Sequence, residues 1–224
     1  MIIFDSVTKK FGSSIALDEI SLDIKQGEFV FVVGPSGAGK STLLRILTRE
    51  LLPTSGKVFV DKIDLTKLPG KEIPNLRRKI GMVFQDFRLL DERTVFENVA
   101  LSLEVRGKGE EEIVKAVEHI LKLVEIWEKR NLFPRQLSGG EAQRTAIARA
   151  IVGKPDIVLA DEPTGDLDPK TAWGVIQLLN EINSWGTTVI MATHNQEIVN
   201  TLKKRVVVLK NGKITKDTKE GKYE

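Results

Sequence analysis

Residues 29–42 read FVFVVGPSGAGKST, and this stretch decides the fold. Its first five residues are apolar, which is typical of a buried strand, and the apolar residues from Leu43 to Leu47 recur with helical spacing. Between the expected strand and helix, residues 34–41 fit the pattern G-x-x-x-x-G-K-[ST]. A chance turn rich in glycine is the alternative, but the complete pattern in a strand–loop–helix context favours a loop that binds phosphate groups.

The residue types of this loop explain how it would hold phosphate. Glycines let backbone N–H groups approach phosphate oxygens, and the N-terminus of the helix adds a partial positive charge. Lys40 is expected to reach the β- and γ-phosphates of a nucleoside triphosphate during catalysis, while the Ser41 hydroxyl would hold Mg²⁺. The predicted nucleotide-binding residues of the loop are Gly34, Pro35, Ser36, Gly37, Ala38, Gly39, Lys40, Ser41 and Thr42.

Composition excludes several other classes of function. The chain has 224 residues, 34 basic and 31 acidic, so its net charge of +3 gives no strong signal for nucleic acid. It has no cysteine, which excludes disulfides, thiolate zinc sites and thiol catalysis. No stretch approaches the roughly 20 apolar residues that span a bilayer, and the start lacks the features of a signal peptide. We therefore expect a cytosolic protein, or a peripheral one on the cytosolic side of a membrane.

Two further apolar strands, expected over residues 80–84 and 187–193, are followed by polar residues. Open α/β sheets bind ligands at the carboxyl ends of their strands. Gln85 could therefore reach Mg²⁺ or water, and His194 could donate to a γ-phosphate oxygen. A purely structural role is the alternative for each residue when it is considered alone.

A third strand, expected over residues 156–162, ends in two carboxylates. Successive side chains on a strand diverge, so the two acids should have different roles. Asp161 is predicted to hold the Mg²⁺ shell, and Glu162 to act as the general base that polarises water for attack on the γ-phosphate. A cap for the helix after Pro163 is the alternative.

Residues 86–152 change character, because they contain no convincing strand. A helix is expected over residues 95–103, and a second helix follows it with one apolar stripe. The residues of that stripe are Ile113, Val114, Val117, Ile120, Leu121 and Val124. We interpret this region as a helical subdomain inserted into an α/β core.

The insert ends at the sequence LSGGE, residues 137–141, which opens another helix. Ser138 and Glu141 stand in the S-x-x-E register of a capping box. A cap does not require Gly139 and Gly140, each of which costs roughly 1 kcal/mol relative to alanine inside a helix. Close approach to an anionic ligand would explain them. This second anion site must either fold back to the phosphate loop or serve the nucleotide of another subunit.

Strands are also expected over residues 2–7, 20–24 and 57–60. Phe11 lies in a polar setting between the first two, where it could stack on a base or form the edge of the core.

The C-terminal third continues the alternation of helices and strands. Asp168 and Pro169 should start a helix over residues 169–184, and residues 205–215 should form a hairpin. The residues of the helix that are expected to point inward are Val175, Ile176, Leu179 and Ile182. Residues 216–224 are charged and are expected to fray.

The order of these motifs resembles the nucleotide-binding subunits of ABC transporters, over essentially all 224 residues. By this resemblance, residues 34–42 correspond to the Walker A loop, and residues 137–141 to the signature motif. Phe11 corresponds to the aromatic residue that stacks on adenine, Gln85 to the Q-loop, Asp161 and Glu162 to the Walker B pair, residues 166–168 to the D-loop, and His194 to the switch histidine.

The resemblance implies an α/β fold of one domain, residues 1–224. It would have a P-loop NTPase (RecA-like) core with an antiparallel β-subdomain, from residues 1–85 and 153–224, and an inserted α-helical subdomain, residues 86–152. It also implies ATP and Mg²⁺ as ligands, with Ser41, Gln85 and Asp161 around the metal.

The resemblance further implies a head-to-tail homodimer on ATP binding, in which each ATP lies between one Walker A loop and the other subunit's signature helix. The residues that would complete the partner's site are Ser138, Gly139, Gly140, Glu141 and Asp168. Glu141 stands where the commonest signature has Gln, and Asn195 follows the switch histidine where Asp is frequent. Neither departure is expected to abolish ATP binding.

Residues 83–90, 93–99 and 192–199 resemble one group of this family, the cell-division ATPases. That group works with an integral membrane protein, and the complex controls peptidoglycan hydrolases outside the cell. The resemblance thus implies a peripheral location at the cytoplasmic face of the membrane. The alternatives are an energy-coupling ATPase of a lipoprotein-release, macrolide-export or methionine-import transporter, and an ATP-gated scaffold that barely hydrolyses ATP. The insert is too short for the long coiled coil of nucleic-acid-linked relatives, so no nucleic-acid partner is expected.

Overall fold

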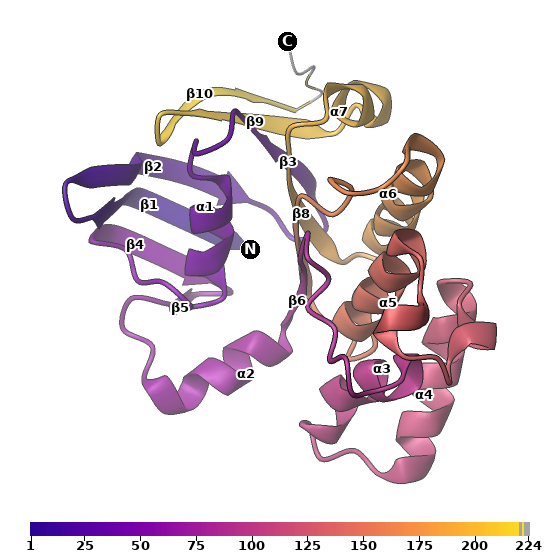
Figure 1. Cartoon of the computed structure of the whole chain (residues 1–224). Coiled ribbons are helices and arrows are strands. Elements are labelled where there is room, and N and C mark those ends of the chain that lie inside the picture. Colours follow the sequence, from indigo (N-terminus) through magenta and orange to yellow (C-terminus); the bar gives the residue numbers. More distant parts are fainter. Residues whose placement is uncertain (220, 222–224) are drawn as a thin grey trace.

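The computed structural model describes residues 1–219 and Gly221, which form two sheets and surrounding helices (Figure 1). Within these residues, the larger sheet has the strand order β10-β9-β3-β8-β7-β6, and the smaller, antiparallel sheet has the order β2-β1-β4-β5. The larger sheet comprises β3 (Phe29–Val33), β6 (Ile80–Val83), β7 (Ile157–Asp161), β8 (Thr188–Thr193), β9 (Arg205–Lys210) and β10 (Lys213–Thr218). The smaller comprises β1 (Ile2–Phe11), β2 (Ser14–Ile24), β4 (Ser55–Val60) and β5 (Ile63–Asp64).

Strand β3 is the central element, and all five of its residues are buried. It pairs in parallel with β8 on one side and β9 on the other, which explains why its sequence is continuously apolar. Val30 and Val32 face a core shared with the smaller sheet and helix α1 (Lys40–Leu47). Phe29 and Phe31 belong to a second core. The helices that share this core lie on the opposite side of the larger sheet, where Figure 1 shows α3 to α6. The predicted strand, loop and helix are therefore confirmed.

Between β6 and β7 the described chain holds helices and no strand, as predicted for this region. The helices are α3 (Val95–Glu104), α4 (Glu110–Leu123) and α5 (Gly139–Ile151), with short 3₁₀ turns between α4 and α5. Four residues of the predicted α4 stripe are buried and Ile113 is partly buried against the core, but Val114 is 42% exposed, so the stripe is not buried along its whole width. Full burial in α4 begins only at Val117, because the first turn of the helix extends beyond the core.

Several boundaries differ from the sequence predictions. The β1–β2 hairpin is longer than predicted and pairs Phe11 with Ser14, because its polar residues lie on an exposed face. Strand β10 continues to Thr218, so fraying from residue 216 was wrong, and residues 220 and 222–224 of that prediction lie outside the described residues.

Two short helices were missed, and one long helix was predicted well. Helices α2 (Ile73–Arg78) and α7 (Gln196–Leu202) are too short for a periodic pattern to identify. Helix α6 (Pro169–Ser184) has the predicted start and inward face. No helix of the described residues is both long and apolar enough to cross a membrane.

Candidate active site

The phosphate loop connects the carboxyl end of β3 to α1 and is enclosed by other backbone segments. Gly34 has φ +151°, and a Cβ there would lie 2.1 Å from the Leu209 carbonyl oxygen. Gly39 has φ +107°, and a Cβ there would lie 2.4 Å from the Ala16 carbonyl oxygen. Both conformation and space therefore require glycine. The first amides of α1 have no partner inside the helix and are available to an anion in the loop.

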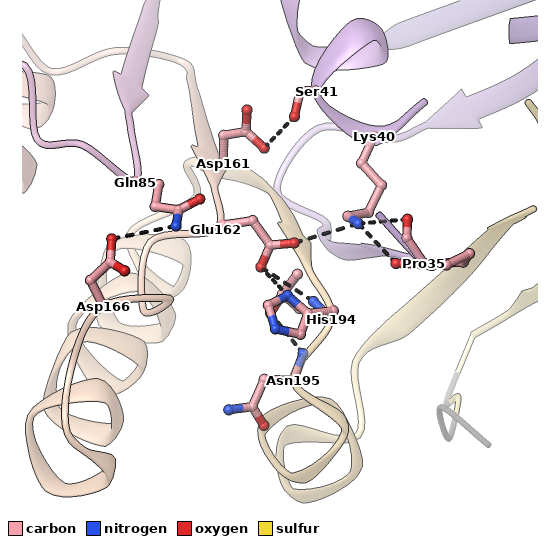
Figure 2. A network of polar contacts seen from close by, with 11 residues as sticks. Pro35, Lys40, Ser41, Gln85, Asp161, Glu162, Asp166, His194 and Asn195 are labelled. Atoms are coloured by element: carbon pink, nitrogen blue, oxygen red, sulfur yellow. Dashed lines mark hydrogen bonds and ion pairs between the residues drawn. The ribbon is translucent and has the colours of Figure 1, made fainter. Parts of the chain in front are cut away.

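Lys40 is folded into this loop (Figure 2). Its Nζ donates to the carbonyl oxygens of Gly34 at 2.8 Å and Pro35 at 3.2 Å, and lies 3.4 Å from Glu162 Oε1. Only 7% of the residue is exposed. The ammonium group is thus held where the loop would receive phosphate, with neutral carbonyls that a more negative ligand can replace.

Asp161 lies at the end of β7, beside Ser41 at the start of α1. Ser41 Oγ donates to Asp161 Oδ1 at 3.0 Å. Burial raises the pKa of Asp161, and this effect outweighs the hydrogen bond from Ser41, which acts in the opposite direction.

The site suits Mg²⁺ in the chemistry of its donors. Hydroxyl and carboxylate oxygens are ligands that Mg²⁺ prefers, and Ser41 and Asp161 place one of each side by side. Among the described residues, no group of three or more His, Cys, Asp or Glu could hold a metal by itself. Mg²⁺ commonly takes only one or two protein carboxylates and completes its shell with water and substrate phosphates.

Glu162 follows directly but has left the strand, with φ +47°. Its Oε2 lies 2.9 Å from His194 Nδ1 and accepts from the His194 backbone N–H at 3.3 Å (Figure 2). The glutamate is mostly buried, whereas the His194 side chain is 67% exposed. The two acids do diverge as expected, because Asp161 contacts Ser41 while Glu162 contacts Lys40 and His194.

A cavity of about 540 Å³ collects most of the predicted catalytic residues. It is lined by residues 35–42 of the phosphate loop together with Ala16, Gln85, Glu162 and His194. Gln85 follows β6, and its Nε2 donates to Asp166 Oδ2 at a long 3.4 Å. The carboxyl ends of β3, β6, β7 and β8 thus meet around one cavity, although the role of each residue stays a prediction.

The signature residues are organised by their own chain. Ser138 Oγ accepts from the Glu141 N–H at 3.3 Å, and Glu141 Oε2 accepts from the Ser138 N–H at 2.9 Å, so the capping box is present. The hydrogen bond from Ser138 lowers the pKa of Glu141. A Cβ on Gly140 would lie 2.3 Å from Thr171 Cγ2. Packing within the chain therefore already accounts for Gly140, which the sequence reasoning had attributed to a ligand.

Gly34 and Asp161 do not line the cavity but contact the lining residues Lys40 and Ser41. Three further groups of predicted ligands do not line it within the described residues. The signature residues 138–141 lie elsewhere, and Asp168 caps α6 by accepting from the amides of Lys170 and Thr171, each at 3.1 Å. Phe11 ends β1; the residue is 47% exposed, and Lys9 Nζ lies 4.9 Å from the centroid of its ring. Contacts of these residues with nucleotide stay predictions.

Sequence reasoning missed two polar residues near Gln85, the buried Asn98 and the half-buried Arg149. Asn98 in α3 and Arg149 in α5 both bind backbone groups of the segment that follows Gln85. The sequence gives no clear signal for either residue, and in α5 the polar residues Gln143 and Thr145 are buried as well.

Comparisons with known protein families and with known sequences both identify relatives among ATP-binding subunits. A model of the ABC transporter family matches residues 17–165. The chain is 54% identical over 224 residues to the cell division ATP-binding protein FtsE of Bacillus subtilis, covering 100% of this chain and 98% of that protein. It is 48% identical over 203 residues to the methionine import ATP-binding protein MetN of Carboxydothermus hydrogenoformans, covering 90% of this chain but 60% of that protein.

A solved structure gives the same result for the fold. The dimeric structure of the ATP-binding cassette MJ0796, in a post-hydrolysis state bound to ADP and Pi, matches with a TM-score of 0.90 and 41% identity, covering 100% of both chains. The predicted α/β architecture and the similarity to cell-division ATPases are thereby confirmed. Because the family model matches more than half of the chain and relatives align along its whole length, the chain belongs to the ABC transporter family.

Proposed function

We propose that this chain is the ATP-hydrolysing subunit of a complex similar to FtsEX, with an FtsX-like integral membrane protein as its partner. The single observation that carries the chemistry is the position of Glu162, whose carboxylate lies between Lys40 and His194 at the phosphate loop. The similarity to FtsE over the whole chain supports the proposed role in cell division and the FtsX-like partner.

The residues of the cavity suit hydrolysis of ATP. Lys40 and the amides of the phosphate loop bind the β- and γ-phosphates. Glu162 accepts a proton from the attacking water, and His194 orients Glu162 through its Nδ1 contact. His194 also lines the cavity of the phosphate loop, from where it would donate to the γ-phosphate. Mg²⁺, when bound, neutralises charge on the phosphates, and Ser41, Asp161 and Gln85 are the residues that would hold it.

Two copies of the chain are needed in this proposal. Residues 138–141 and Asp168 do not line their own subunit's cavity, so a second subunit would place them against its nucleotide. ATP binding then closes a head-to-tail homodimer, and hydrolysis reopens it. The partner would sense this cycle as a conformational change at the cytoplasmic face of the membrane, with an indirect link to cell-wall hydrolases.

A transport role is the second candidate, because the chain is also similar to MetN. Coverage favours the cell-division role: the aligned region spans 98% of the FtsE relative but only 60% of the MetN relative. A transport subunit would use the same ATP chemistry with a different membrane partner.

Glu162→Gln tests the proposal. It should retain ATP binding, lose turnover and accumulate an ATP-bound dimer by size-exclusion chromatography with light scattering. Lys40→Ala is the matched control, because it should lose nucleotide affinity and remain monomeric under the same conditions. A monomeric Glu162→Gln protein with normal turnover would refute the catalytic assignment.

The partner is tested by purifying tagged Glu162→Gln from detergent-solubilised membranes of its own source with ATP and Mg²⁺. A small integral membrane protein with a large extracytoplasmic domain supports the FtsEX-like complex. A many-spanning permease with a solute-binding protein would instead make this chain a transport subunit.

A further inference from the structure

The segment that follows Gln85 has an unusual backbone. Phe87 and Arg88 have φ values of +56° and +48°, so two consecutive residues with side chains adopt the left-handed conformation. The Arg88 N–H donates to the Asp86 carbonyl oxygen at 2.5 Å, which closes a three-residue turn. Non-glycine residues hold such a conformation only where the surrounding structure imposes it.

Arg149 of α5 is the group that contacts this turn. Its Nη2 donates to the Phe87 carbonyl oxygen at 2.8 Å, and its Nη1 donates to the Arg88 carbonyl oxygen at 2.5 Å. Carbonyl groups of consecutive residues point in opposite directions along an extended chain. One guanidinium can bind both only if the chain turns sharply between them, and the positive φ values supply that turn.

Arg149 is fixed by its own surroundings. It is half-buried, and desolvation lowers its pKa. Its backbone carbonyl oxygen accepts from Ser102 Oγ of α3 at 2.9 Å, which joins α3 and α5 at this point. The guanidinium therefore directs its charge to two neutral carbonyls from a rigid position, a geometry that a lysine ammonium cannot reproduce with the same fork.

The rest of the segment is anchored in a similar way. Asn98 of α3 is fully buried, and its side chain accepts from the Leu90 N–H at 2.8 Å and donates to the Leu90, Arg93 and Thr94 carbonyl oxygens. The chain from Gln85 to α3 is thus held at two places by polar side chains of the helical region, Arg149 and Asn98. Arg149 provides the anchor nearest to Gln85, because it binds Phe87, which lies two residues after Gln85 in the chain.

We propose that Arg149 is a positioning residue for Gln85: by binding the Phe87 and Arg88 carbonyls, it imposes the turn that sets where Gln85 lies in the cavity. This inference rests on the proposed function, in which Gln85 helps to hold Mg²⁺. Arg149 does not line the cavity of the phosphate loop. It acts through the backbone of residues 86–88, and it links the position of Gln85 to the helix that begins with the signature residues.

The test removes the hydrogen bonds that hold the strained turn at residues 86–88. Arg149→Met retains most of the side-chain length but loses the donors, so the turn should open. Hydrogen exchange of a peptide over residues 84–90, measured on the full chain without nucleotide, should then be faster by about tenfold or more, as expected for the loss of two hydrogen bonds from a charged group. Binding of an ATP analogue is then titrated with Mg²⁺. The variant should need a higher Mg²⁺ concentration for half of the Mg²⁺-dependent increase in binding, while its binding without Mg²⁺ should not change.

A second substitution separates positioning from general damage. Phe87→Gly removes the steric cost of positive φ, so it should restore slow exchange and Mg²⁺ response in the Arg149→Met background. Phe87→Ala is the matched control, because it removes the same ring but retains a Cβ, and it should restore neither. If Arg149→Met does not fold, Arg149→Lys is used in the same backgrounds.

The outcomes are distinguishable. Unchanged exchange and Mg²⁺ response in a folded Arg149 variant would overturn the inference, and so would equal rescue by glycine and alanine. If the unmodified chain itself shows no Mg²⁺-dependent binding of ATP analogue, the proposed function fails instead.

Discussion

Gly140→Ala should destabilise the protein in the absence of any nucleotide. Alanine is normally favoured over glycine inside a helix by up to about 1 kcal/mol, so helix propensity alone predicts a gain in stability. The structure predicts the opposite, because the new Cβ would lie 2.3 Å from Thr171 Cγ2. Real Cβ atoms do not approach a carbon this closely, so α5 and α6 must move apart or Thr171 must rotate.

Rotation of Thr171 has its own cost. Its hydroxyl and amide donate to the Asp168 carboxylate at the start of α6, and these hydrogen bonds hold the pKa of Asp168 below its usual value. A rotated Thr171 would give up the hydroxyl contact. Overpacking of this kind typically costs about 1–3 kcal/mol, so after the gain in propensity we expect a net loss of about 1–2 kcal/mol in the free energy of unfolding.

Urea denaturation of the nucleotide-free protein measures this loss, and the chain supplies a control. A Cβ on Gly139 would meet Leu167 Cδ2 at 3.4 Å, which is an ordinary contact, so Gly139→Ala should be neutral or slightly stabilising. Thr171→Ser removes Cγ2 and should recover most of the loss in the Gly140→Ala background. If Gly140→Ala is as stable as Gly139→Ala, or if Thr171→Ser recovers nothing, the packing argument is refuted.

Two further predictions concern stability. Asp161→Asn should make the nucleotide-free protein more stable at neutral pH: burial raises the pKa of Asp161 in the folded state, so its contribution to stability falls as pH rises through that pKa. In urea titrations, the difference in unfolding free energy between Asp161→Asn and the unmodified protein should vanish as the pH falls to the unfolded-state pKa of about 3.9. A difference that does not depend on pH would contradict the role of Asp161 ionisation. Asn98→Ala should lower the free energy of unfolding by about 2–4 kcal/mol, because four backbone groups lose their hydrogen-bond partner. The exposed Asn75→Ala is the control, and a smaller loss for Asn98→Ala than for Asn75→Ala would contradict this prediction.

Much of the fold could be predicted because the strands of the larger sheet are buried on both faces. Such strands are continuously apolar, so β3, β7 and β8 are visible in the sequence with nearly correct ends. The β1–β2 hairpin is partly exposed, and its alternation is broken by irregular pairing between Phe4 and Lys10, so its length could not be inferred. Val114 fits the helical period and is nevertheless 42% exposed, although its neighbour Ile113 packs against the core. The helical period alone does not show how far the core extends around the helix.

The candidate site was predictable wherever its residues follow strands of known direction. Parallel strands bring their carboxyl ends to one edge, so the meeting of Gln85, Glu162 and His194 at the phosphate loop follows from topology. Arg149 was not predictable, because its function depends on contact with a turn more than sixty residues away in the sequence. The sequence shows the residue type, but only the packing of α5 against the segment after β6 shows what it binds.

Glycines in a nucleotide-binding motif can be required for packing within the protein as well as for contact with the ligand. Gly34, Gly39 and Gly140 all belong to segments predicted to bind nucleotide, yet protein atoms already exclude a Cβ at each of them. A loss of activity on substitution at these positions therefore does not by itself demonstrate a lost ligand contact.

Gly37 differs, because no protein atom lies within 4 Å of where its Cβ would be, although its φ of +78° favours glycine. Since glycine and asparagine both tolerate positive φ, Gly37→Asn should leave the unfolding free energy nearly unchanged and weaken nucleotide binding if the loop must admit phosphate closely. Comparing that substitution with Gly140→Ala would separate the requirement for the ligand from the requirement for packing.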